Sequence, residues 1–168
     1  IMNSETEHDR PDACEPDMQG DIVFDDVSFA YDGCPELLSH ISLTVPAGTT
    51  VGILGGTGSG KSTLVHLLDR LYELPADGSG GRITIGGVDI ADIRAAYLRR
   101  NIGIVLQEPY LFSRSIADNI SMARSDIGME DIREAARVAC LDDTVEGFTE
   151  GYDTFVGERG VTLSGGQK

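Results

Sequence analysis

Basic residues are scarce in this chain of 168 residues, which has 13 lysines and arginines against 28 aspartates and glutamates. The formal net charge is −15, and the only two lysines are Lys61 and Lys168. A surface this acidic repels the phosphates of nucleic acid and the headgroups of anionic membranes. We therefore expect no nucleic-acid partner.

Cysteine, histidine and long apolar runs are also in short supply. Cys14, Cys34 and Cys140 are an odd number without C-x-x-C spacing, which favours a reduced compartment over a disulfide framework or a metal site. The three histidines are scattered, so nothing supports a His–Cys metal cluster. No apolar run is long enough for a membrane helix, and no segment has the pattern of a signal peptide. We expect this stretch to be soluble by itself, which does not exclude a membrane-bound parent protein.

Glycine, by contrast, is abundant, with 21 residues, and one stretch places it in a specific pattern. The pattern G-x-x-x-x-G-K-[ST] is matched without exception within Gly55-Gly56-Thr57-Gly58-Ser59-Gly60-Lys61-Ser62-Thr63. A polyphosphate needs several converging backbone N–H groups, and glycines let the chain curl tightly enough to supply them. Lys61 lies where an ammonium reaches the outer phosphates, and Ser62 lies where a hydroxyl binds Mg²⁺. The pattern predicts a phosphate-binding loop.

The segments on either side of this loop support the same interpretation. Thr50–Leu54 has the pattern of a short buried strand. Lys61–Tyr72 is predicted to be a helix, with apolar residues at positions 64, 65, 67, 68 and 71. A strand, a glycine loop and a helix N-terminus together aim the positive end of a helix dipole at an anion.

The chain before and after the loop divides by composition and periodicity. Residues 1–20 are polar, acidic and interrupted by prolines, and we interpret them as a linker. Strand patterns are found at Ile22–Phe29, Ile41–Val45, Arg82–Ile85 and Ile102–Leu106, and a helical pattern at Ala91–Arg99.

From Ser113 onward the patterns are helical. Ser115–Asp118 resembles a capping box, and Met129–Cys140 carries an apolar stripe at helical spacing. The layout is therefore a β-rich segment, an α/β nucleotide core and a helical insertion at about residues 115–150. The expected fold class is α/β, a P-loop NTPase core with an N-terminal antiparallel β subdomain and an α-helical insertion subdomain, incomplete at the C-terminus.

Three further features are weaker when each is taken alone. Tyr31 fits an ordinary strand aromatic that packs in the core. Gln107 ends the predicted strand Ile102–Leu106, where a carboxamide can bind Mg²⁺ or position a water. Leu163–Gln167 is more specific, because two glycines behind a serine form a second anion-binding turn.

Together, Tyr31, the phosphate loop, Gln107 and Leu163–Gln167 resemble the nucleotide-binding domains of ABC transporters in order and approximate spacing. The resemblance runs from about Asp21 to the last residue. Three stretches are similar to the exporter branch in particular: Gln107–Phe112, Ile116–Ile120 and Val156–Gly160. In that branch the domain usually follows a membrane domain in one polypeptide, so the resemblance implies that residues 1–20 are the remainder of that join.

The resemblance implies a role for each matching residue. Tyr31 would stack on the adenine of ATP, residues 55–63 would hold its phosphates, and Ser62 and Gln107 would bind Mg²⁺. Lys61 and Gln107 would act in hydrolysis, and Glu158 would lie near the transmission loops of the membrane domain. The signature residues would contact the γ-phosphate of ATP bound to a second nucleotide-binding domain, in a homo- or heterodimer at the cytoplasmic face of the membrane: Ser164, Gly165, Gly166 and Gln167.

The family pattern continues past the signature with a helix, an apolar strand ending in Asp-Glu and a switch histidine. None of these is found in the 168 residues, so we expect residues 1–168 alone to bind ATP without hydrolysing it. Three alternative functions compete with this interpretation. A non-transport ABC ATPase is disfavoured by Val156–Gly160 and by the acidic charge. A P-loop kinase or GTPase would not need Leu163–Gln167, and a binding-only module stays open.

Overall fold

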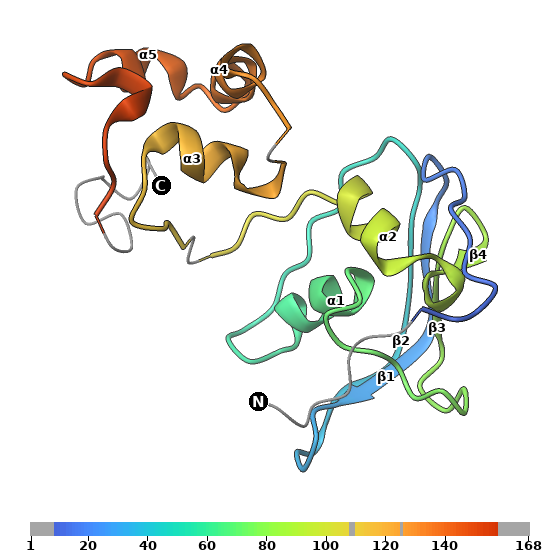
Figure 1. The fold of residues 1–168 in the computed structure, drawn as a ribbon. Helices are drawn as coiled ribbons and strands as arrows, with labels where there is room; N and C mark the ends of the chain where they lie inside the picture. Colours follow the sequence, from blue (N-terminus) through green and yellow to red (C-terminus); the bar gives the residue numbers. More distant parts are fainter. Residues whose placement is uncertain (1–8, 108–109, 125, 158–168) are drawn as a thin grey trace. The chain divides into compact units, whose positions relative to one another are not determined.

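The computed structural model describes residues 9–107, 110–124 and 126–157. The chain forms two compact units, Ile1–Gly103 and Ile104–Lys168. Figure 1 shows the helices and strands of both units as a ribbon. Each unit has its own cluster of buried apolar side chains.

The first unit is built on an antiparallel sheet with strand order β2-β1-β3-β4. Its elements are β1 (Ile22–Ala30), β2 (Glu36–Val45), α1 (Lys61–Leu68), β3 (Arg82–Ile85), β4 (Val88–Asp89), the 3₁₀ turn η1 (Ile90–Asp92) and α2 (Ala95–Asn101). The strands predicted at Ile22–Phe29, Ile41–Val45 and Arg82–Ile85 are confirmed, and so is the antiparallel arrangement.

The core of the first unit lies between this sheet and the helices α1 and α2, which are on the same side of it (Figure 1). The sheet contributes Phe24 and Ile83, and the helices contribute Leu67 and Leu98, all almost fully buried. Burying each such side chain stabilises the fold by about 1.5–3 kcal/mol. The packing of α1 fixes the position of the loop that precedes it.

The second unit is helical. Its elements are α3 (Ile116–Ile120), the 3₁₀ turn η2 (Ser121–Ala123), α4 (Met129–Val138), α5 (Asp142–Glu146) and the 3₁₀ turn η3 (Gly151–Asp153). The Ser115 hydroxyl accepts from the Asp118 N–H at 3.0 Å, which confirms Ser115 as a helix cap. The apolar stripe predicted in α4 is buried at Ile132 and Ala136.

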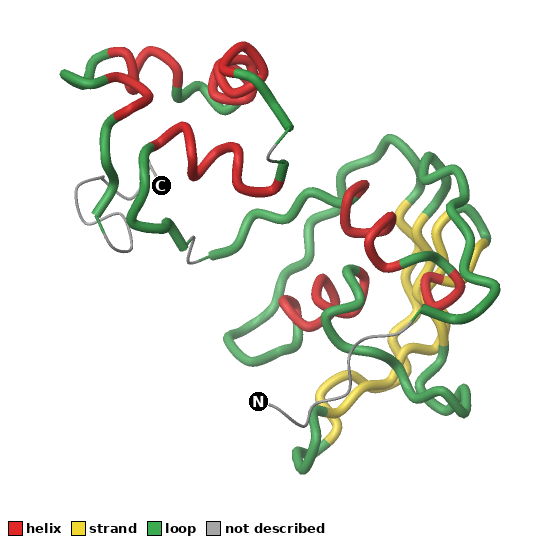
Figure 2. Tube along the Cα trace, viewed as in Figure 1, coloured by secondary structure: helices red, strands yellow, loops and turns green. Residues whose placement is uncertain are grey.

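Two predicted strands are wrong. Residues 46–60 form one continuous loop (Figure 2), in which Leu54 is 98% exposed instead of buried. Ile102–Leu106 is also irregular, and Val105 is 99% exposed. A strand needs a neighbouring backbone to satisfy its N–H and C=O groups, and within the described ranges no strand pairs with either segment.

The helix predicted to reach Tyr72 ends earlier, at Leu68. Arg70 has a left-handed backbone with φ of 52°. The Arg70 N–H donates to the Leu67 carbonyl at 3.0 Å, and the Leu71 N–H donates to the His66 carbonyl at 2.9 Å. This pair of bonds is the Schellman motif, which closes a helix and redirects the chain. The helix predicted at Ala91–Arg99 is similarly divided into η1 and α2, since the backbone is extended at Ile93.

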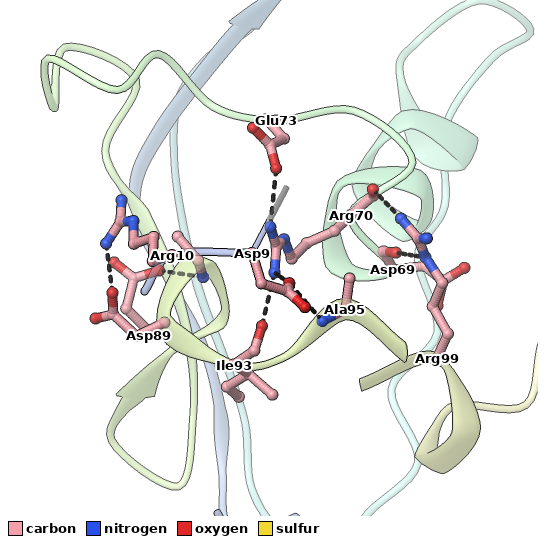
Figure 3. Close-up of polar contacts among 11 residues, drawn as sticks. Asp9, Arg10, Asp69, Arg70, Glu73, Asp89, Ile93, Ala95 and Arg99 are labelled. Carbon is pink, nitrogen blue, oxygen red and sulfur yellow. Dashed lines mark hydrogen bonds and ion pairs between the residues drawn. The ribbon is translucent and has the colours of Figure 1, made fainter. Parts of the chain in front are cut away.

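Residues 9–20 pack against the rest of the first unit. The Asp9 carboxylate accepts from the Ala95 N–H at 2.9 Å and pairs with the Arg70 guanidinium at 3.4 Å (Figure 3). Further along, Cys14 exchanges backbone hydrogen bonds with the segment at Ile93. That residues 1–20 also join an upstream membrane domain stays a prediction.

Candidate functional site

The glycine-rich loop precedes α1 and depends on two left-handed glycines. Gly58 has φ of 79° and Gly60 has φ of 84°, both in the region that other residues rarely adopt. A Cβ atom on Gly60 would also lie 2.5 Å from Cδ2 of Leu38 in β2. Only glycine therefore lets the loop pass the sheet and turn into the helix at this point.

The Lys61 ammonium lies within the curl of this loop. Its Nζ donates to the carbonyls of Gly55 at 2.8 Å and Gly56 at 2.7 Å, and to the Ser59 hydroxyl at 3.3 Å. A flexible side chain thus holds a positive charge over the loop, ready to exchange carbonyl oxygens for phosphate oxygens.

The first turn of α1 is electrostatically suited to an anion. It contains no acidic residue, and Gly60 has no side chain with which to cap it. The partial positive charge of the helix N-terminus is therefore not neutralised locally. Ser62 is exposed in this turn, whereas Thr63 is buried.

Tyr31, which follows β1, is brought to this turn. Its hydroxyl and the Thr63 hydroxyl are 2.9 Å apart and hydrogen-bonded. Tyr31 also lines a cavity of about 750 Å³, together with Phe29, Tyr72 and Pro75. The structure therefore joins two predicted site residues that are 32 positions apart.

The other predicted site residues belong to the second unit or lie outside the described residues. Gln107 is exposed and belongs to the second unit. Glu158 and the signature residues lie outside the described residues: Ser164, Gly165, Gly166 and Gln167.

The donor set of the loop fits a hydrated Mg²⁺, which prefers oxygen ligands and usually takes few from the protein. The exposed Ser62 hydroxyl at the start of α1 is one such oxygen. Across the described ranges, no group of three or more His, Cys, Asp or Glu side chains could hold a metal ion. Within those ranges, no helix is long and apolar enough to cross a bilayer.

Sequence reasoning missed Tyr72 as a possible site residue. The helical pattern predicts that Tyr72 is the last residue of a helix. In the structure Tyr72 follows the Schellman motif, and its ring contacts that of Tyr31. The left-handed Arg70 leaves no signal in the sequence, because arginine is not a residue expected there.

Comparison with known proteins agrees with this geometry. A family profile described as ABC transporter matches residues 38–168. The β-(1→2)-glucan export ATP-binding/permease protein NdvA of Rhodopseudomonas palustris is 45% identical over 161 residues, covering 95% of this chain and 26% of that protein. The α-hemolysin translocation ATP-binding protein HlyB of Escherichia coli O157:H7 is 44% identical over 169 residues, covering 100% of this chain and 23% of that protein.

A solved structure of a bacterial Atm1-family ABC exporter with ATP bound has the same fold, with a TM-score of 0.87 and 40% identity. The alignment covers 96% of this chain and 28% of that one. The chain thus spans about a quarter of the length of the proteins it matches. The match to the family profile and these identities show that the chain belongs to the ABC transporter family, as part of an ATP-binding domain of the exporter type.

Proposed function

We propose that this chain binds ATP and Mg²⁺ through residues 55–63, and that the intact protein hydrolyses ATP to drive export of a substrate across a membrane. The observation that carries the proposal is the position of the Lys61 ammonium. It is held by the Gly55 and Gly56 carbonyls beside the uncapped N-terminus of α1. Such a loop offers a mobile cation and converging backbone dipoles to one polyphosphate.

Each residue of the loop has a defined part in this proposal. Lys61 moves its ammonium from the loop carbonyls to the outer phosphates and neutralises charge that develops there. The Ser62 hydroxyl binds Mg²⁺, which in turn neutralises the phosphate oxygens when bound. The backbone N–H groups from Gly56 to Thr63 surround the remaining oxygens. Tyr31 stacks on the base.

The remaining parts of the proposal lie away from this loop. Gln107 binds Mg²⁺ or orients the attacking water. The signature residues Ser164–Gln167 contact ATP held by a second nucleotide-binding domain, so that hydrolysis requires a dimer. Support for a membrane domain comes from relatives named as combined ATP-binding/permease proteins. We place the chain at the cytoplasmic face of the membrane, where ATP is available.

Substitution of Lys61 tests the proposal. Lys61→Ala should weaken ATP binding by about 2–5 kcal/mol, because the phosphates lose their charged partner. The measurement is isothermal titration calorimetry with ATP and Mg²⁺ on the intact protein. Arg100→Ala is the matched control, since it removes one exposed positive charge elsewhere in the first unit. Unchanged ATP affinity in Lys61→Ala would show that the loop is not the nucleotide site.

A further inference from the structure

Three aromatic rings meet beside the phosphate loop. The centroids of Tyr31 and Tyr72 are 4.9 Å apart with an interplanar angle of 83°, and those of Tyr31 and Phe29 are 5.0 Å apart at 85°. The Phe29 and Tyr72 centroids are 5.9 Å apart. Edge-to-face pairs at these separations are attractive because the positive edge of one ring meets the negative face of another.

These three separations form a triangle that is close to equilateral. Phe29 and Tyr72 are therefore neighbours of each other as well as of Tyr31. Neither of them lies on the opposite side of Tyr31. Tyr31 is only partly buried, and it lines the cavity of about 750 Å³. A base that stacks on this side of Tyr31 would leave both neighbours in place.

The hydroxyl of Tyr31 supplies a third point of attachment. Its bond to the Thr63 hydroxyl at 2.9 Å ties the far end of the ring to the first turn of α1. Two nearly perpendicular neighbouring rings and a hydrogen bond at the tip restrict both side-chain torsions of Tyr31. The ring is therefore held in one orientation before a base arrives.

Tyr72 reaches this position only because α1 ends early. The left-handed Arg70 turns the chain after Leu68, and the Glu73 carboxylate accepts from the Arg70 guanidinium at 2.9 Å within the same turn. Tyr72 is 44% exposed and makes its ring contacts at the edge of the core. The position of the Tyr72 side chain is therefore determined by the turn at Arg70. Burial of an apolar surface is not the reason, because the side chain stays exposed.

We propose that Tyr72 is a positioning residue for base recognition, which holds the Tyr31 ring in the orientation that stacks on adenine. This inference rests on the proposed function, in which Tyr31 contacts the base. A side chain that is already ordered loses less conformational freedom when a ligand binds. Removing the Tyr72 ring should therefore weaken binding of the base without affecting the phosphates.

The test compares two ligands, ATP and inorganic tripolyphosphate, each with Mg²⁺, by calorimetry on the intact protein. Tyr31→Ala should lower ATP affinity and leave tripolyphosphate affinity unchanged. Tyr72→Ala should lower ATP affinity by about twofold to tenfold, the cost of ordering one side chain, and also leave tripolyphosphate unchanged. Tyr72→Phe should bind ATP as the wild type does, because the ring contact needs no hydroxyl.

Two further variants separate positioning from general damage. The double variant Tyr31→Ala with Tyr72→Ala should bind ATP no more weakly than Tyr31→Ala alone, since Tyr72 acts only through Tyr31. Leu71→Ala is the matched control: Leu71 is 51% exposed, adjacent to Tyr72, and does not line the cavity. It should bind both ligands normally.

The inference is overturned if Tyr72→Ala binds ATP normally while Tyr31→Ala does not. It is also overturned if Tyr72→Ala weakens both ligands equally, as a misfolded loop would, or if its effect adds to that of Tyr31→Ala. Failure of the wild-type protein to bind ATP would instead overturn the proposed function, and the inference with it.

Discussion

Asp69, at the C-terminal end of α1, is a buried carboxylate in an unfavourable place. Its side chain is 8% exposed, and within the described residues its Oδ1 atom accepts no hydrogen bond. Burial raises the pKa of Asp69, and the charges of Arg99 and His66 offset this only in part. Arg99 donates to the backbone carbonyl of Asp69 at 3.0 Å (Figure 3). The charged form of Asp69 is therefore a cost to the fold.

This pKa shift predicts a pH dependence of stability. Just above pH 3.8, the ordinary pKa of an aspartate, Asp69 of the folded protein still holds its proton, because its pKa is raised. The unfolded chain has already released that proton at the same pH. The stability from this group is therefore full below the ordinary pKa and is lost as the pH rises through the raised pKa. Asp69→Asn should gain stability relative to the wild type as the pH rises above the ordinary pKa of 3.8, measured by urea unfolding.

The control for this prediction is a carboxylate with the opposite shift. Hydrogen bonds from Ser79 lower the pKa of the exposed Asp77. Its contribution is present above the ordinary pKa and is lost as the pH falls. Asp77→Asn should therefore lose stability relative to the wild type as the pH rises. Two variants that respond to pH in the same direction would contradict the assignment.

At the scale of elements, α2 is capped by a side chain from far away in the sequence. Arg94 immediately precedes this helix and provides no side-chain cap. Instead the Asp9 carboxylate accepts from the Ala95 N–H at 2.9 Å, across 86 positions. The same carboxylate pairs with the Arg70 guanidinium, which also donates to the Ile93 carbonyl at 2.6 Å (Figure 3). The segment at residues 9–20 thus stabilises both helices of the first unit.

Removal of this cap is expected to be measurable. Asp9→Ala should lower the free energy of unfolding of the first unit by about 0.5–2 kcal/mol, the usual cost of a lost N-cap. The comparison is with Asp12→Ala, an exposed carboxylate in the same segment. Chemical denaturation monitored by circular dichroism measures both variants. Equal destabilisation by the two substitutions would mean that negative charge in this segment, and not the cap, is what matters.

The same elements show what the sequence could and could not predict. β1, β3 and the second half of β2 were predicted correctly because their residues have strand patterns and their backbones pair within the first unit. Thr50–Leu54 has the composition of a buried strand but is exposed, since composition does not say which backbone lies beside it. The end of α1 was misplaced because it depends on the conformation of Arg70 and not on a local stop residue.

For the candidate site, local patterns were sufficient only where the chemistry is local. The loop at residues 55–63 was predicted from its glycines and Lys61, and the structure forms it as a curl ending at α1. The contact between Tyr31 and Thr63 joins a strand end to a helix start, and no spacing rule predicts it. Tyr72 and Asp9 were missed for the same reason: their partners are set by tertiary folding.

At the scale of the whole molecule, the chain has two separate cores. One lies between the sheet and α1 and α2, and the other among the helices after Ile104. In the second core, the buried Tyr152 hydroxyl donates to the Asp142 carboxylate at 2.6 Å, and the Arg133 guanidinium lies 5.5 Å from the Tyr152 ring centroid. Burial is the main cause that raises the pKa of Tyr152 to about 12, and the hydrogen bond to Asp142 is the second.

Two cores predict two cooperative units, because regions that each have their own core can open separately. Tyr152→Phe keeps the ring but removes the bond to Asp142, so amides in α4 and α5 should exchange about threefold to tenfold faster. Amides in β1 should exchange as in the wild type. In Asp9→Ala, by contrast, amides in β1 should exchange faster, and those in α4 and α5 should exchange as in the wild type. Hydrogen exchange with mass spectrometry resolves the two regions. Faster exchange across both units in either variant would show instead that the chain opens as one body. In that case the helical unit would stabilise the nucleotide loop through the same cooperative transition.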